Sequence, residues 1–158
     1  MSQRHVRDLG VVIDSQLSLS AQVTAVCRSG YYQLRQLRPL VRSMSAEVVK
    51  TLVQAFISCR LDYYNSVFYG TTEGLMSRLQ SVQNAAARLV SGARRYDHIM
   101  PVLQELHWLP VRRRMDFKMA ALVYLSLSGM VPAYLAADCR SPTKVVVNCV
   151  LPHQGRAL

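Results

Sequence analysis

Residues 72–92 read TEGLMSRLQSVQNAAARLVSG, and this stretch decides the fold class of the chain. Its apolar side chains recur at steps of three and four residues, which places them along one face of an α-helix. Thr72 suits the N-terminal cap, and Gly92 suits the C-terminal end because glycine readily adopts the left-handed conformation found there. We therefore predict one long helix between these two residues. Its apolar face would consist of Leu75, Leu79, Val82, Ala86, Leu89 and Val90.

Two further helices are predicted before this stretch. Residues 18–38 carry apolar side chains near helical spacing and are followed by Pro39, which cannot continue a helix. A second helix is predicted to begin at Ser45, with Glu47 in its first turn, where the helix dipole favours an anion.

Two more helices are predicted after it, the first short and capped by Asp97, the second long and running from Pro110 to near Gly129. Residues 6–13 are rich in Val and Ile and predict one short strand or half of a hairpin. The expected fold is mainly α, with about five helices in an irregular bundle after one short N-terminal β-strand or hairpin. The side chains expected to share its core are Leu79, Val82, Leu89, Trp108, Met119 and Leu122.

The chain carries a strong excess of positive charge. Lys and Arg together number 19 against 9 Asp and Glu, which gives a formal net charge of +10. All but Lys50, Lys118 and Lys144 are arginines, whose forked guanidinium group suits phosphate oxygens. The excess favours a polyanionic partner, RNA, DNA or an RNA–DNA hybrid, bound through its phosphates. A solvated basic surface and attraction to anionic lipid are the alternatives.

The candidate contacts to nucleic acid gather in three groups on the predicted helices. The first lies on one face of the 18–38 helix, the second near the C-terminal end of the 72–92 helix, and the third in the first turns of the last long helix. Cations at a helix C-terminus also complement the dipole, so the second group has a structural explanation as well. In that order the residues are Arg28, Arg35 and Arg38; Arg88, Arg94 and Arg95; and Arg112, Arg113, Arg114 and Lys118.

The run Arg112-Arg113-Arg114 conflicts with local helix electrostatics. Exposed cations in a first turn oppose the helix dipole at about 0.3–1 kcal/mol each, so their removal is expected to preserve or raise stability. A functional explanation is that the helix N-terminus and three guanidinium groups bind a phosphate together. The alternative is a structural ion-pair network with Glu105 or Asp97.

No catalytic, metal or cofactor site is predicted. Two-metal polymerase chemistry requires closely placed carboxylates, whereas the aspartates and glutamates of this chain are scattered and include no Asp-Asp pair. The histidines and cysteines have no metal-ligand spacing, and no glycine-rich phosphate loop is present. His98 beside Asp97 could form half of an acid–base pair, but a cap residue followed by a partly buried histidine is the more ordinary explanation. Cys27 and Cys59 are expected to be buried thiols.

The N-terminal residues contain no apolar segment of signal-peptide length, so an intracellular protein of the nucleus or cytoplasm is expected. The stretch between Lys118 and Asp138 is uncharged and long enough to span a bilayer, but Gly129 and Pro132 interrupt it. Two helical pieces around a break are expected there rather than a membrane helix.

Several short blocks, in this order along residues 6–140, resemble the reverse transcriptases of LINE-type (non-LTR) retrotransposons. Each block is modest alone, and their order and spacing together are specific. The blocks are VRDLGV at 6–11, RLDYYN at 60–65, LQSVQNAAAR at 79–88, YDHI at 96–99 and HWLPV at 107–111, followed by Arg114, Asp116, Phe117, Lys118 and then LVY at 122–124.

The resemblance implies the segment downstream of the catalytic palm, that is, the thumb and a C-terminal extension. Residues 1–17 would be a remnant of the palm-end strand on the primer-grip side, 18–140 the helical thumb-like and extension domain, and 141–158 a divergent, poorly ordered tail. A thumb grips the template–primer duplex through phosphate contacts and shape, with little base readout. The implied protein is thus a catalytically incomplete fragment of an RNA-directed DNA polymerase.

Two other expectations stand beside this one. A face meant to pack on the missing palm would be exposed and would favour self-association. The alternative to nucleic-acid binding is a helical protein-interaction module, or an inert translated remnant of a retroelement, whose charge is incidental.

Overall fold

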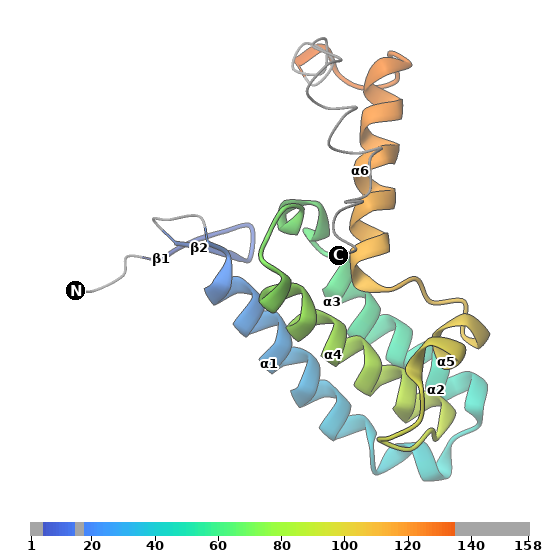
Figure 1. Cartoon of the computed structure of the whole chain (residues 1–158). Coiled ribbons are helices and arrows are strands. Elements are labelled where there is room, and N and C mark those ends of the chain that lie inside the picture. Colours follow the sequence, from blue (N-terminus) through green and yellow to red (C-terminus); the bar gives the residue numbers. More distant parts are fainter. Residues whose placement is uncertain (1–4, 15–17, 135–158) are drawn as a thin grey trace, which may run out of the picture. The chain divides into compact units, whose positions relative to one another are not determined.

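The computed structural model describes residues 5–14 and 18–134, which divide into two compact units, one ending at Arg114 and the other beginning at Met115. Across the described residues the chain is mainly helical after a short N-terminal hairpin, which confirms the predicted fold class (Figure 1).

The N-terminal hairpin pairs β1 (His5–Asp8) with β2 (Val11–Asp14) in antiparallel register, with Val6 opposite Ile13. Leu9 and Gly10 form its two-residue turn, and both have positive φ angles, of 45° and 82°. Such a turn matches the right-handed twist of the two strands, and glycine adopts the required conformation without strain. The strand-rich segment 6–13 is therefore folded back on itself at Leu9–Gly10.

The first helix begins and ends close to the predicted residues, and the second helical segment begins where it was predicted. α1 (Ser20–Leu37) is followed at Pro39 by the single 3₁₀ turn η1 (Leu40–Ser43). α2 (Ala46–Val53), the π-helical turn η2 (Gln54–Ser58) and α3 (Cys59–Asp62) then form one continuous helical run, with Ser45 at its N-terminal cap position.

The prediction that Cys59 is buried is wrong, because Cys59 is exposed. Val49, Val53 and Ile57 are buried at four-residue steps along this helical run. Cys59 follows Ile57 by two residues, about 200° further around a helix, so it lies on the side opposite to these buried residues. Cys27 is buried, as predicted.

The stretch that decided the fold class forms α4 (Glu73–Ser91), preceded by the short 3₁₀ turn η3 (Asn65–Phe68). Thr72 occupies its N-terminal cap position, and Gly92 ends it in the left-handed conformation with a φ of 72°. Both predicted ends of this helix are confirmed.

The helices after α4 are α5 (Ile99–Glu105) and α6 (Val111–Leu127). The cap position of α5 is His98 and not Asp97 as predicted. Asp97 instead closes the preceding turn, where its Oδ2 atom accepts a 2.6 Å hydrogen bond from the backbone N–H of Arg94. Pro110 directly precedes α6, and its carbonyl oxygen accepts a hydrogen bond from the backbone N–H of Arg114. With α2, η2 and α3 taken as one helix, the described residues hold five helices, as expected.

The core of the first unit is built mainly by α1 against α4, which lie side by side (Figure 1). Val23 on α1 and Val82 on α4 are fully buried. Gly30 lets the two helices approach closely, because a Cβ atom added there would lie only 2.6 Å from Cγ1 of Val82.

The predicted core residues have different outcomes. Leu79, Val82 and Trp108 are buried, which confirms their predicted place. Leu89 and Met119 are only half-buried. Leu122 is 40% exposed, so its predicted burial is wrong. Apolar residues occur on several sides of α6, since Phe117 and Tyr124 share a side that lies far around the helix from Leu122, and a periodic pattern alone could not tell which side is covered.

Candidate nucleic-acid interface

The first predicted group of arginines lies together on the solvent-facing side of α1. Arg28, Arg35 and Arg38 are all exposed, and Arg38 directly follows the last residue of the helix. Their separations of seven and three residues place them on one helical face. Tyr31 lies on the same face, three residues after Arg28 and four before Arg35, and it is 44% exposed. We call these four residues the α1 stripe.

The α1 stripe has no carboxylate in its neighbourhood along the chain. The sequence contains no Asp or Glu between Ser15 and Ala46, a segment that spans all of α1 and η1. Arg42, on η1, is a further exposed cation of the same segment. The α1 stripe is therefore a surface whose positive charge is not neutralised by acids of its own helix.

Arg78 of α4 adds a cation that the sequence analysis did not identify. Its Nη2 atom donates a 3.1 Å hydrogen bond to Oγ1 of Thr24, which lies on α1 one turn before Arg28. Burial raises the pKa of the Cys27 thiol, and the positive charge of Arg78 partly offsets this effect. Both observations place Arg78 beside the N-terminal half of α1. Helical spacing within one element could not have found it, because the contact joins two helices.

Tyr31 is held partly against the helix surface. Partial burial raises the pKa of its hydroxyl, and the nearby Cys27 thiol, one turn earlier on α1, adds to the increase. A tyrosine hydroxyl is neutral at physiological pH even without this increase, so the ring face of Tyr31 carries no competing negative charge. Tyr31 was not among the residues predicted from the sequence. Its helical spacing to Arg28 and Arg35, the same signal that grouped the arginines, would have identified it.

The second predicted group surrounds the loop after α4. The Nε atom of Arg88 donates to the carbonyl oxygen of Arg94 at 3.2 Å, which ties the end of the helix to this loop. The guanidinium group of Arg94 donates to the hydroxyl of Tyr96 at 2.6 Å and lies 6.0 Å from the centre of its ring. Arg95 is exposed. Arg88 and Arg94 thus contribute to loop structure, whereas Arg95 faces solvent.

The three arginines of the third predicted group differ in their ion pairs. Arg112 forms an exposed ion pair with Glu73, the first residue of α4. Arg114 directs Nη1 at both carboxylate oxygens of Asp62, each at 2.9 Å, and its side chain is only 14% exposed. Arg113 is exposed. The run therefore takes part in structural ion pairs, but with Glu73 and Asp62 as partners and not with Glu105 or Asp97.

Lys118, the last predicted contact residue, lies on α6 in the second unit and is half-buried. The structure thus brings together the arginines of the α1 stripe, and it places Arg112 and Arg114 in ion pairs at the start of α6.

A polar network joins α4 to the start of α6. The side-chain oxygen of Gln80 accepts a 2.9 Å hydrogen bond from the backbone N–H of Val111, so it satisfies one of the unpaired donors at the N-terminus of α6. The buried Gln83 donates to the carbonyl oxygen of Leu109 at 2.8 Å, and Nε of Arg114 donates to the same oxygen at 3.0 Å. Gln80 also donates to Gln83 and Asn84.

The hairpin is fixed to the helices by two side chains. The hydroxyl of Tyr63 donates to the carbonyl oxygen of Leu9 at 2.7 Å, and Gln22 on α1 accepts from the backbone N–H of Val12 at 2.9 Å. Residues from the blocks at 6–11, 60–65, 79–88 and 107–111 therefore contact one another directly or through Arg114.

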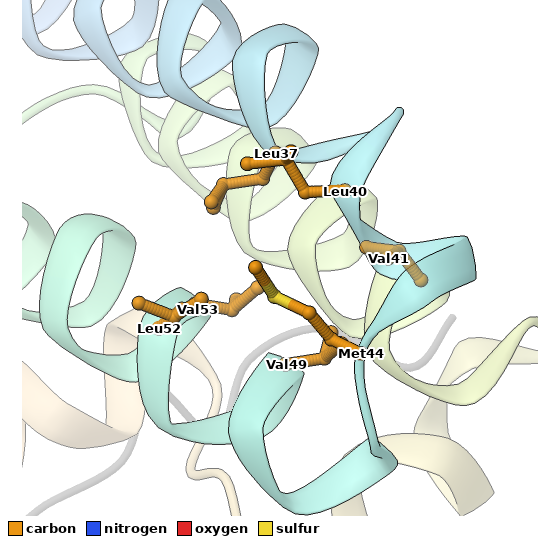
Figure 2. A pocket seen from close by; sticks show the side chains of 7 residues that line it. All are labelled: Leu37, Leu40, Val41, Met44, Val49, Leu52 and Val53. Carbon is orange, nitrogen blue, oxygen red and sulfur yellow. The ribbon is translucent and has the colours of Figure 1, made fainter.

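An apolar recess lies where α1, η1 and α2 meet (Figure 2). It is too narrow to admit a sphere of the size of a water molecule, and it has no polar side chain among its lining residues. The recess is therefore a seam in the packing and offers no binding chemistry. Its lining consists of Leu37, Leu40, Val41, Met44, Val49, Leu52 and Val53.

Within the described ranges, no three His, Cys, Asp or Glu side chains gather in a way that could hold a metal ion. Among the same residues, no helix combines the length and apolar character that crossing a bilayer requires.

Comparison with protein-family models, with curated proteins and with solved structures found no match to this chain.

Proposed function

We propose that this chain is a catalytically incomplete segment of a LINE-type reverse transcriptase, whose thumb-like helical region binds the backbone of nucleic acid without sequence preference. The observation that carries the proposal is the α1 stripe, in which Arg28, Arg35 and Arg38 face solvent on a helix without acidic residues. Arginines arranged in this way contact phosphates and release counterions, and they read no bases.

The positions of the resembling blocks support the origin of the segment. Asp62 and Tyr63 of RLDYYN, Gln80 and Gln83 of LQSVQNAAAR, and Leu109 of HWLPV are the residues that connect the helices of the first unit. Blocks that are far apart in sequence thus contact one another in the folded first unit. If the blocks that resemble the family are these contact residues, the resemblance reflects a fold shared with the family. The exposed arginines would then be the residues that bind nucleic acid.

The alternative function, a helical protein-interaction module, predicts a different surface. An amphipathic partner helix requires an apolar groove with room for its side chains. The recess between α1, η1 and α2 has no such room. The exposed, acid-free α1 stripe favours a polyanion as the partner.

The test is a salt titration of binding to a labelled oligonucleotide duplex, with wild type and the variant Arg28→Gln, Arg35→Gln, Arg38→Gln. Binding of wild type should weaken as a power of the salt concentration. The variant should bind less tightly, and its slope of log affinity against log salt should be shallower by about 2–3 units, roughly one for each phosphate that the variant no longer neutralises.

A matched control removes the same charge elsewhere with Arg60→Gln, Arg95→Gln and Arg113→Gln. These three side chains are exposed and lie off α1. The control should retain most of the affinity and slope. Equal losses in both variants would show diffuse attraction and contradict a binding surface on α1, and absence of binding by wild type at low salt would overturn the proposed function.

A further inference from the structure

We propose that the α1 stripe binds an unpaired strand of RNA or DNA, with Tyr31 stacked on a base and with Arg28 and Arg35 on the phosphates at either side. This inference rests on the proposed function and deepens it, because it names the form of nucleic acid that α1 takes. Arg78 extends the same surface from the neighbouring helix α4.

The first argument is the alternation of cation and ring along one helix face. Residues 28, 31, 35 and 38 follow the i, i+3, i+7, i+10 spacing of a single stripe, and their order is Arg, Tyr, Arg, Arg. With a rise of about 1.5 Å per residue, Arg28 and Arg35 are about 10 Å apart along the helix axis, and Tyr31 lies between them. A ring flanked by two guanidinium groups matches a base flanked by two phosphates.

The second argument is the exposure of the aromatic rings. Tyr31 is 44% exposed and the adjacent Tyr32 57% exposed, although the buried side of α1 is packed against α4. In a duplex the base faces are covered by their neighbours, so a tyrosine on a helix surface can reach only phosphates and sugars. An unpaired strand presents free base faces, and stacking on an aromatic ring is tolerant of sequence.

The third argument is the charge on either side of the rings. Arg78 is fixed beside Thr24 by its hydrogen bond, one turn before Arg28, and Arg38 lies one turn after Arg35. The cations therefore continue beyond both ends of the Arg28–Tyr31–Arg35 unit. A continuous basic track with an aromatic ring in it is the arrangement that binds single strands without base readout.

The test compares an unpaired oligonucleotide with a blunt duplex of the same sequence, each bound to the full chain at fixed salt. Tyr31→Leu keeps an apolar side chain against α1 but has no ring, and it should weaken binding of the unpaired strand about 5- to 150-fold, the range of one stacking interaction. Duplex affinity should change by less than about twofold, because the ring stacks on no base there. Tyr31→Phe keeps the ring and should bind both forms like wild type.

A second measurement uses unmodified protein and so does not depend on the folding of a variant. An oligonucleotide with photoreactive 4-thiouridine is crosslinked to wild type, and the protein is digested with trypsin. Cleavage after Arg28 and Arg35 releases SGYYQLR, residues 29–35, which contains Tyr31. The crosslinked base should be found on this peptide, and fragmentation should assign it to the ring of Tyr31.

The outcomes separate this inference from the function on which it rests. Binding of an unpaired strand through Tyr31 is overturned if Tyr31→Leu binds that strand like wild type and the crosslink maps to another peptide. The proposed function still stands in that case if the variant Arg28→Gln, Arg35→Gln, Arg38→Gln binds the duplex less tightly than wild type. If wild type binds neither form at low salt, both are overturned. A selective loss of unpaired-strand affinity together with a crosslink on residues 29–35 supports both.

Discussion

The guanidinium group of Arg114 and the carboxylate of Asp62 form an ion pair across 52 positions of sequence, with Nη1 2.9 Å from each carboxylate oxygen. The Arg114 side chain is 14% exposed, and its Nε atom also donates to the carbonyl oxygen of Leu109. One arginine thus ties the end of α3 and the segment before α6 to the start of α6. The pair gives a structural reason for a cation in a first helical turn, where the dipole alone disfavours it.

We predict that Arg114→Gln lowers the free energy of unfolding by about 1–3 kcal/mol, because it removes charge-assisted hydrogen bonds from a mostly buried group. Arg113→Gln is the matched control, since Arg113 is exposed one residue earlier, and its effect should stay within about 0.5 kcal/mol. Denaturant unfolding measures both. Equal stability of the two variants would show that the ion pair contributes nothing, and the expectation that all three arginines can be removed without loss would then stand.

Gly30 permits the close contact of α1 and α4, and Gly30→Ala should destabilise the first unit. The added Cβ atom would meet Cγ1 of Val82 at 2.6 Å, and Val82 is fully buried with a stiff, β-branched side chain. Overpacking of this kind costs about 1–3 kcal/mol, which outweighs the gain of up to about 1 kcal/mol that alanine normally gives inside a helix.

Gly74→Ala is the control for Gly30→Ala. Gly74 lies in α4 with no atom within 4 Å of an added Cβ, so alanine should be neutral or stabilising there. The double variant Gly30→Ala, Val82→Ala should lose less stability than the sum of the two single variants, because the smaller side chain at position 82 makes room for the added Cβ atom. Thermal unfolding that leaves Gly30→Ala as stable as Gly74→Ala would contradict the close helix contact.

Local signals in the sequence predicted much of this fold, and contacts between distant segments account for most of what they could not predict. Thr72 and Gly92 mark the ends of α4 because caps act on the residues next to them. The shared face of the arginines on α1 was predictable because helical periodicity fixes which residues lie on one side of a helix. Cys59 was misplaced because its apolar neighbours were taken as evidence of burial, whereas the buried residues Val49, Val53 and Ile57 leave it on the opposite side of the helix.

The candidate site shows the same difference between local signals, which the sequence contains, and contacts between distant segments, which it does not reveal. The spacing of Arg28, Arg35 and Arg38 was enough to place them on one helical face. Arg78 was missed because its contact with Thr24 joins residues 54 positions apart. The acidic partners proposed for the run Arg112-Arg113-Arg114, Glu105 or Asp97, were wrong for the same reason, since a single sequence ranks nearby carboxylates above those that the fold brings from distant helices.

The two described cysteines should differ in reactivity toward thiol reagents. Burial raises the pKa of Cys27 above its ordinary value, so its reactive thiolate is scarce at neutral pH, and the side chain is covered. Cys59 is exposed. Native protein treated with iodoacetamide at pH 7.5 should be modified faster at Cys59 than at Cys27, as measured on the separate tryptic peptides. The difference should disappear in denaturant, and equal rates in native protein would contradict the burial of Cys27.

The raised pKa of Cys27 also predicts a loss of stability at alkaline pH. A group whose pKa is higher in the folded state stabilises the fold while both states are protonated, and this contribution is lost as pH rises past the unfolded value of about 8.5. The free energy of unfolding should therefore fall as pH rises from about 8.5 through the raised pKa of folded Cys27. Cys27→Ala should show a smaller fall than wild type over that interval, although it starts from a lower stability. An identical decline in both proteins would assign the effect to other groups, such as Tyr31.

The last prediction concerns catalysis: the purified chain should extend no primer on an RNA or DNA template, with either magnesium or manganese. Polymerisation needs two metal ions held by closely placed carboxylates, and the acidic residues of this sequence are scattered along it without an Asp-Asp pair. The assay includes an active reverse transcriptase as the positive control. A preparation of Tyr31→Leu made in the same way serves as the control for a contaminating polymerase, which would extend the primer equally in both preparations. Incorporation that depends on the template, increases with the amount of this chain and survives further purification would overturn its assignment as a catalytically incomplete segment. Binding of the same template–primer in the absence of extension would agree with a chain that holds nucleic acid and leaves the chemistry to a palm.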